Sequence, residues 1–128
     1  NSIIGEGEAA SLNPTLGWIG SLTNISPGGG YWIRVDSDDM LILPGESVDC
    51  GELNFNLNEG ANLISYCCEQ SMPLDIIPGD CSEIVGEGAA STFNPVLGWI
   101  GNLQELKPGK GYWLKCSDQI QMQWDCSE

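Results

Sequence analysis

The chain has 128 residues, which is enough for one domain or for two small ones that share a core. Its formal net charge is -14, and no apolar run approaches the length of a membrane span, so binding to nucleic acid and insertion into a membrane are not expected. Frequent glycine and proline, with an ordinary content of apolar residues, indicate short strands joined by tight turns rather than a disordered chain.

One sequence pattern occurs twice, 81 residues apart. Residues 3–43 align with residues 84–124 without a gap, and eighteen of these forty-one positions are identical. The shared pattern reads I-x-G-E-G, then N-P-x-L-G-W-I-G-x-L, then P-G-x-G-Y-W. Residues 44–83, the middle segment, have no second copy. We therefore interpret residues 1–43 as the rear half of a first repeat and residues 44–128 as a complete second repeat, the two packed as one compact unit.

The first copy is predicted to consist of short strands separated by turns that contain glycine or proline. A glycine-rich turn precedes the Tyr-Trp pair, because glycine supplies the positive φ that such a turn requires. The last strand is expected to end at Pro44-Gly45. The predicted strands are residues 3–4, 9–12, 17–22, 31–35 and 40–43.

The middle segment has a different pattern. Residues 53–57 alternate between apolar residues and asparagine, and residues 61–67 form a second extended run after an Asn-Glu-Gly turn, which together predict a β-hairpin. Residues 71–77 are expected to hold one helical turn, with proline at an early position. The second copy then repeats the strands of the first and ends in an alternating strand at residues 119–124. The predicted fold class is all-β, a small disulfide-linked sandwich or barrel of about eight to ten strands.

The cysteines number six, an even count in a short acidic chain without histidine, which indicates disulfides and an oxidising compartment. Zinc is the alternative, but the paired C-x-x-C spacings that it favours do not occur. Two adjacent cysteines of a strand point to opposite faces, so we expect Cys67 and Cys68 to take different partners, while the pairing itself stays open. The cysteines are Cys50, Cys67, Cys68, Cys81, Cys116 and Cys126.

Two stretches resemble a known type of module. Residues 58–65 (N-E-G-A-N-L-I-S) and residues 107–115 (K-P-G-K-G-Y-W-L-K) are similar to repeat modules of secreted and cell-surface bacterial proteins and of some virion fibre proteins. Those modules carry a G-W-N-L-I-S hairpin and a later P-G-K-G-Y-W strand, and Ala61 stands where they usually have tryptophan. The resemblance covers about residues 44–124 and the rear half of a second module. It implies an extracellular all-β building block, and it supplies no catalytic residues.

Catalysis is not expected from this sequence, and neither is a cofactor. Without histidine, the usual base or metal ligand of hydrolases is missing. The Gly-Glu-Gly triplets lack the full dinucleotide fingerprint, so a turn or bulge is the favoured interpretation. Asp36, Asp38 and Asp39 are candidates for a weak calcium site, with a solvated turn as the favoured alternative. Asn24 is a glycosylation candidate, because Asn24-Ile25-Ser26 fits the acceptor pattern, although Pro27 follows it.

The aromatic residues of the two copies have two interpretations, contact between repeats or subunits and a platform for sugar rings. In each Tyr-Trp pair one side chain is expected to face the core and the other to face outward. The residues predicted to pack the repeats or to join subunits are Ile3, Ile4, Gly5, Trp18, Tyr31, Trp32, Trp99, Tyr112 and Trp113.

The first copy has no counterpart of the middle segment in front of it, which leaves a sheet edge to be paired. A strand from another copy of the chain would complete that edge through main-chain hydrogen bonds. The closing tetrapeptide at residues 125–128 resembles residues 80–83, which precede the second copy, so the contact is expected to run head-to-tail and to give filaments. The sequence thus predicts a subunit of an extracellular or cell-surface filament, with copies of itself as partners. A monomeric adhesion or carbohydrate-binding module, with glycans as partners, is the alternative.

Overall fold

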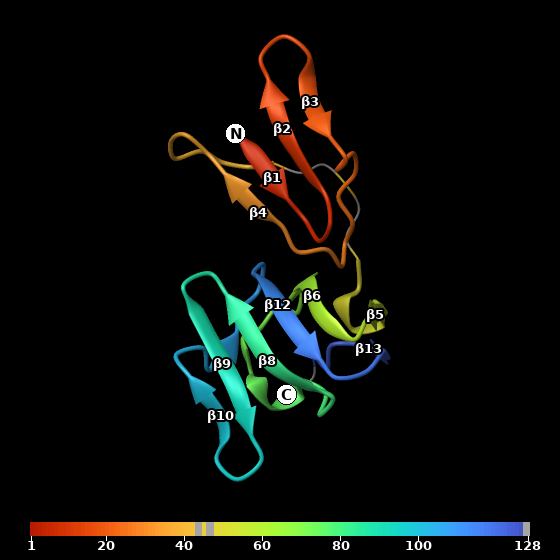
Figure 1. Cartoon of the computed structure of the whole chain (residues 1–128), viewed down its shortest axis with the longest axis vertical. Helices are drawn as coiled ribbons and strands as arrows, with labels where there is room; N and C mark the ends of the chain where they lie inside the picture. The colour runs from red at the N-terminus through yellow and green to blue at the C-terminus, as the bar shows by residue number, and fades with distance from the viewer. Residues whose placement is uncertain (43–44, 46–47, 127–128) are drawn as a thin grey trace.

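The computed structural model describes residues 1–42, 45 and 48–126. In these residues almost all regular structure is β, so the expectation of an all-β fold is confirmed. No helix in the described part of the chain is long and apolar enough to cross a membrane. Figure 1 shows the strands of the first copy at one end of the long axis and the strands from β5 onward at the other.

The first copy forms a four-stranded sheet in which every pairing is antiparallel. Its spatial order is β3-β2-β1-β4, so β4 is an edge strand that pairs with β1. Its turns coincide with the glycines and with the Asn-Pro dipeptide predicted to break the strands. The bounds are β1 (Ser2–Ile4), β2 (Ala9–Asn13), β3 (Gly17–Gly20) and β4 (Trp32–Arg34).

The second copy forms the same arrangement with one strand more. Its sheet has the order β10-β9-β8-β12-β6, and β6 comes from the middle segment. The strand β12 therefore has a partner on both sides, whereas its counterpart β4 has one. The bounds are β6 (Gly60–Ser65), β8 (Cys81–Gly86), β9 (Ala89–Asn94), β10 (Gly98–Gly101) and β12 (Gly111–Cys116).

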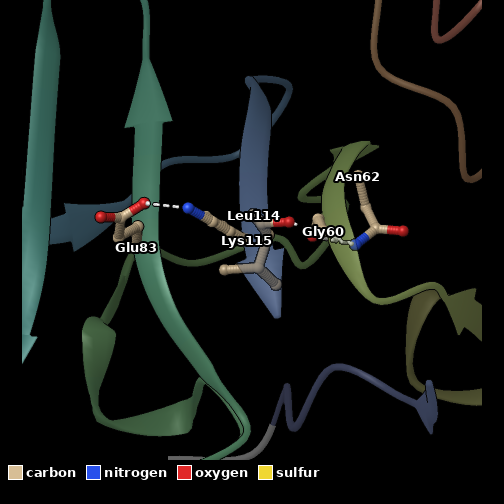
Figure 2. A network of polar contacts seen from close by, with 5 residues as sticks. All are labelled: Gly60, Asn62, Glu83, Leu114 and Lys115. Carbon is tan, nitrogen blue, oxygen red and sulfur yellow. Dashed lines mark hydrogen bonds and ion pairs between the residues drawn. The ribbon is translucent and has the colours of Figure 1, made fainter. Parts of the chain in front are cut away.

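Polar contacts hold β12 in place on each side (Figure 2). On the β8 side, the Lys115 ammonium lies 3.7 Å from the Glu83 carboxylate. On the β6 side, the buried amide of Asn62 donates to the carbonyls of Leu114 and Gly60, each at 3.2 Å. The Asn62 oxygen accepts from the main-chain N–H of Asn58 at 2.8 Å, so this one side chain joins the turn before β6 to the neighbouring strand.

Two short sheets cover the five-stranded one. The predicted hairpin of residues 53–57 and 61–67 is wrong: β5 pairs with β13, and β6 pairs with β12. The apolar residues of β5 point into the core between the layers, so the two runs serve different sheets. The helical turn expected at residues 71–77 is present as η2. The bounds are η1 (Cys50–Glu52), β5 (Phe55–Leu57), β7 (Met72–Pro73), η2 (Leu74–Ile76), β11 (Glu105–Leu106) and β13 (Ile120–Met122).

The hydrophobic core is built from residues 50–126. The Trp124 ring is buried in it, edge-on to Tyr66 with 5.3 Å between ring centroids and to Phe55 with 6.0 Å. The indole N–H of Trp124 donates to the carbonyl of Ser65 at 2.9 Å, which satisfies its polar atom inside the core.

The cysteines form three disulfides in the described residues, as expected for an oxidising environment. The neighbours Cys67 and Cys68 take different partners, which confirms the prediction made from their adjacency. All three bridges lie between residue 50 and residue 126, so they stabilise the half of the chain that holds the core. The pairs are Cys50–Cys67, Cys68–Cys126 and Cys81–Cys116.

The predicted last strand of the first copy does not form. Residues 40–42 are irregular and exposed. Two of their three counterparts in the second copy, Gln121 and Met122, belong to β13, which pairs with β5. The described part of the first copy contains no partner equivalent to β5, and a lone strand is unstable in water. Leu43 and Pro44, where this strand was expected to end, lie outside the described residues.

Candidate functional site

The first sheet has an open apolar face. Cross-strand partners share a face of a sheet, and the register pairs Ile3 with Ile33 and Ile3 with Ala10. Leu12, two residues after Ala10 on β2, points the same way and pairs with Trp18 of β3. Leu12, Trp18 and Ile33 are all exposed, and a contiguous apolar patch of this kind is uncommon on a monomeric surface.

The second copy shows what covers this face when it is buried. Ile33 is 50% exposed, whereas Leu114, its counterpart 81 residues later, is 0% exposed. Leu41 is 64% exposed, and its counterpart Met122 is 4% exposed. The same contrast holds for two further pairs, Ile25 with Leu106 and Val35 with Cys116. The covering side chains of the second copy come largely from the middle segment and β13.

The free edge of β4 lies beside the open face. In the five-stranded sheet the equivalent edge, on β12, pairs with six residues of β6. Arg34 is the only lysine or arginine among residues 1–42, and it is paired with Ser2 across the strands. Its counterpart Lys115 faces Glu83 and forms an ion pair with it. The β4 edge therefore lacks the strand that pairs with β12, and on the other side of β4 Arg34 faces Ser2 where Lys115 faces a carboxylate.

The two halves of the chain meet at the outer edge of β6. The Gly30 N–H donates to the Leu63 carbonyl at 3.4 Å, and the Ser65 N–H donates to the Gly28 carbonyl at 3.1 Å. The Leu63 N–H has a side-chain acceptor instead, because Glu6 Oε1 lies 2.8 Å away. The Glu6 carboxylate thus continues the ladder at the point where the main chain of the first copy turns away.

The I-x-G-E-G motif has a structural role at this contact. A Cβ at Gly5 would lie 3.0 Å from the Tyr31 ring, and a Cβ at Gly86 would lie 3.0 Å from the Tyr112 ring, so a larger residue would crowd the tyrosine in both copies. The glutamate between the two glycines of each motif is exposed, at the end of a strand. Sequence reasoning assigned the triplet to a turn and missed the function of Glu6. The repetition of Gly-Glu-Gly at the same offset is the signal that could have revealed it.

Gly30 lies so close to the main chain of β6 that a side chain would not fit there. A Cβ on this residue would lie 2.8 Å from the Ile64 carbonyl oxygen, which is shorter than any normal contact. Gly30 therefore allows the glycine-rich turn of the first copy to rest directly on β6. The corresponding turn of the second copy is nearby, because a Cβ on Gly111 would lie 3.4 Å from Gly30 Cα.

A groove of about 680 Å³ lies between the two copies. One wall is the start of β4, including Trp32 and Ile33. The opposite wall carries Glu87, Gly109 and Gly111, which are the counterparts of Glu6, Gly28 and Gly30. The Glu87 carboxylate has no hydrogen bond or ion pair with any other described residue.

The structure distributes the predicted aromatic residues over both ends of the molecule rather than bringing them together. Trp18 and Trp32 are exposed, and Trp99 lies edge-on to Phe93 at 5.5 Å between centroids. Trp113 and Tyr31 are half-buried, and Tyr112 is buried in the core. Of the remaining packing candidates, Gly5 is buried, Ile3 is half-buried and Ile4 is exposed.

Two buried tyrosines, Tyr66 and Tyr112, have a raised pKa. Burial raises the pKa of Tyr66, and the charge of Tyr112 adds to the increase. Burial also raises the pKa of Tyr112, the hydrogen bond from the Lys107 N–H opposes this shift, and Glu105 adds to it. Both hydroxyls bond to the main chain. Tyr66 donates to the Gln70 carbonyl at 2.6 Å, and Tyr112 accepts from the Lys107 N–H. They are structural groups of the core.

The structure does not gather the calcium candidates around one point. Asp36, Asp38 and Asp39 lie in an exposed loop, and the Asp39 carboxylate accepts from the Met40 N–H at 2.7 Å. In the described part of the chain, the close group of potential metal ligands consists of three cysteines, and all three belong to disulfides. Asn24, the glycosylation candidate, is exposed in the loop before the glycine-rich turn.

Comparison with protein-family models, with curated proteins and with solved structures finds no match for this chain.

Proposed function

We propose that the protein is a non-catalytic, structural subunit of an extracellular or cell-surface assembly, joined head-to-tail by strand addition at β4. The observation that carries the proposal is the contrast between the two copies. The edge and face that β6 and the rest of the middle segment cover in the second copy are open in the first. A strand donated by a neighbouring subunit would pair the edge through main-chain hydrogen bonds and would bury the face.

The finer architecture is part of the same proposal. Residues 1–43 are the rear half of one repeat, and residues 44–128 are a complete one. The order of four strands and the positive φ at Gly7 and Gly88 support this assignment. The resemblance to modules of secreted surface and fibre proteins points in the same direction, as do the disulfides. A contact that uses different surfaces on the two partners forms a ring when the rotation between subunits closes and a filament when it does not, and we propose the filament.

Electron microscopy and light scattering of the natively purified protein test the assembly. Regular filaments or higher oligomers are expected. The substitution Ile33→Asp places a charge on the open face, where a residue half exposed in the monomer tolerates it, and it should leave a folded monomer that does not assemble. Val96→Asp is the matched control, since Val96 is exposed in the turn between β9 and β10, away from the open face, and this variant should assemble normally.

Monomeric material under all conditions would contradict the proposal, as would equal assembly of the two variants. In that case the exposed rings of Trp18 and Trp32 favour the alternative, a carbohydrate-binding module, since apolar sugar faces pack on such rings. Tryptophan fluorescence in the presence of oligosaccharides would then separate a binding module from an inert domain.

A further inference from the structure

The strand β6 has two kinds of neighbour. Its inner edge pairs with β12, with Leu63 opposite Trp113 and Asn62 opposite Leu114. Its outer edge is held by the first copy, through Glu6 and the glycine-rich turn at residues 28–30. The strand β6 is therefore held by pairing with β12 on one side and by the Glu6 carboxylate and the glycine-rich turn on the other.

Each of these neighbours has a counterpart in the other copy. The counterpart of β12 is β4, whose outer edge is unpaired among the described strands. The counterpart of Glu6 is Glu87, and the counterpart of the turn is residues 109–111. The start of β4, Glu87 and this second turn all line the same groove. The groove is thus the position that β6 would occupy if the two copies were exchanged.

We propose that this groove binds one extended strand with the chemistry of β6, inserted between β4 and Glu87. The inference rests on the proposed function and deepens it by naming the partner segment and the residue that holds it. The volume of the groove falls in the range of ordinary ligand sites, and the groove is open at the surface. The inserted strand would extend the first sheet from four strands to five, as β6 does for the second.

The register of β6 against β12 specifies the partner. By equivalence, a leucine would lie opposite Trp32, an asparagine opposite Ile33 and a small residue opposite Arg34. The leucine N–H would donate to the Glu87 carboxylate, as the Leu63 N–H donates to Glu6. The asparagine amide would reach the Ile33 carbonyl, as Asn62 reaches Leu114.

Titration of the isotope-labelled full chain with a synthetic peptide of residues 59–66 tests the proposal. Saturable NMR shifts are expected at the Trp32 indole and at the Gly109 and Gly111 amides, while the Gly17 amide, in the turn between β2 and β3, stays unchanged. A scrambled peptide of the same composition should cause none of these shifts. The measurement uses the monomeric fraction, so it does not depend on whether filaments form.

Two changes test the contact with Glu87 directly. Glu87→Ala should weaken binding by about ten-fold or more, because it removes a charged acceptor from a main-chain N–H. Methylation of the peptide nitrogen at the leucine removes the donor and should weaken binding to a similar extent, and the two changes together should cost little more than either alone. Glu69→Ala is the matched control, since Glu69 is exposed and lies outside the groove.

Three outcomes would overturn the inference. They are an absence of shifts up to the solubility limit of the peptide, unchanged affinity in the Glu87→Ala variant, and shifts at the same residues produced by oligosaccharides but not by the peptide. Peptide binding by a protein that never assembles would refute the proposed function and leave the site intact. Filaments without peptide binding would do the reverse.

Discussion

Glu6 is an exposed residue whose carboxylate satisfies a main-chain donor of the buried residue Leu63. Glu6→Ala leaves that N–H without its acceptor, and we expect a loss of about 1–3 kcal/mol of unfolding free energy at most, since water can enter from the surface. The amide of Leu63 should also exchange with solvent faster. Glu8→Ala serves as the control, because the Glu8 side chain is exposed and makes no hydrogen bond to a described residue. Equal exchange at Leu63 in the two variants would show that the contact is incidental.

Tyr66 and Tyr112 contribute to the pH dependence of stability at high pH. Their pKa values are raised in the folded state, so the unfolded chain releases these protons first, near the ordinary value of 10.0. Their contribution to stability is therefore fully present below about pH 10 and is lost as the pH rises through the folded pKa. An absorbance titration of tyrosine should show a late fraction that becomes smaller in Tyr66→Phe and in Tyr112→Phe. A single early transition in the native protein would contradict this.

At the scale of elements, one buried side chain adds to the main-chain pairing that holds β6 beside β12. Asn62 is buried and bonds to the main chain of Asn58, Gly60 and Leu114. Asn62→Leu keeps the volume but leaves buried polar groups unpaired, and we expect a cost of roughly 2–4 kcal/mol in urea unfolding. Asn56→Ala, on the exposed face of β5, should cost less than about 1 kcal/mol. Equal effects of the two substitutions would contradict the role assigned to Asn62.

At the scale of the whole molecule, the disulfides stabilise one half of the chain. Cys68–Cys126 closes the longest loop of the three bridges, with a sequence separation of 58, and it ties the segment after β6 to the last described residue. Replacement of both cysteines by serine should lower the unfolding free energy by about 2–4 kcal/mol, because the unfolded chain regains conformational freedom. An unchanged urea midpoint would show that the bridge contributes nothing to the folded state.

Much of the architecture was readable from the residues. Glycine, asparagine and proline marked the turns, alternation marked several strands, and the adjacency of Cys67 and Cys68 favoured separate partners, which the structure shows. The hairpin of the middle segment was wrong because local alternation reports which residues are buried, not which strand they pair with. The strand predicted at residues 40–42 was wrong because its aligned residues Gln121 and Met122 pair with β5. No described segment pairs with residues 40–42 in that way, and the local pattern does not report the difference.

The candidate site divides in the same way. The sequence by itself determined the alignment of residues 3–43 with residues 84–124, the acidic character of the chain and its six cysteines. Only the tertiary structure decided that Glu6 holds β6, that Ile33 is exposed where Leu114 is buried, and that Glu87 and Trp32 line one groove. The physical reason is that turn residues and periodicity act over neighbouring positions, whereas burial and hydrogen-bond partners depend on segments that lie far apart in the chain.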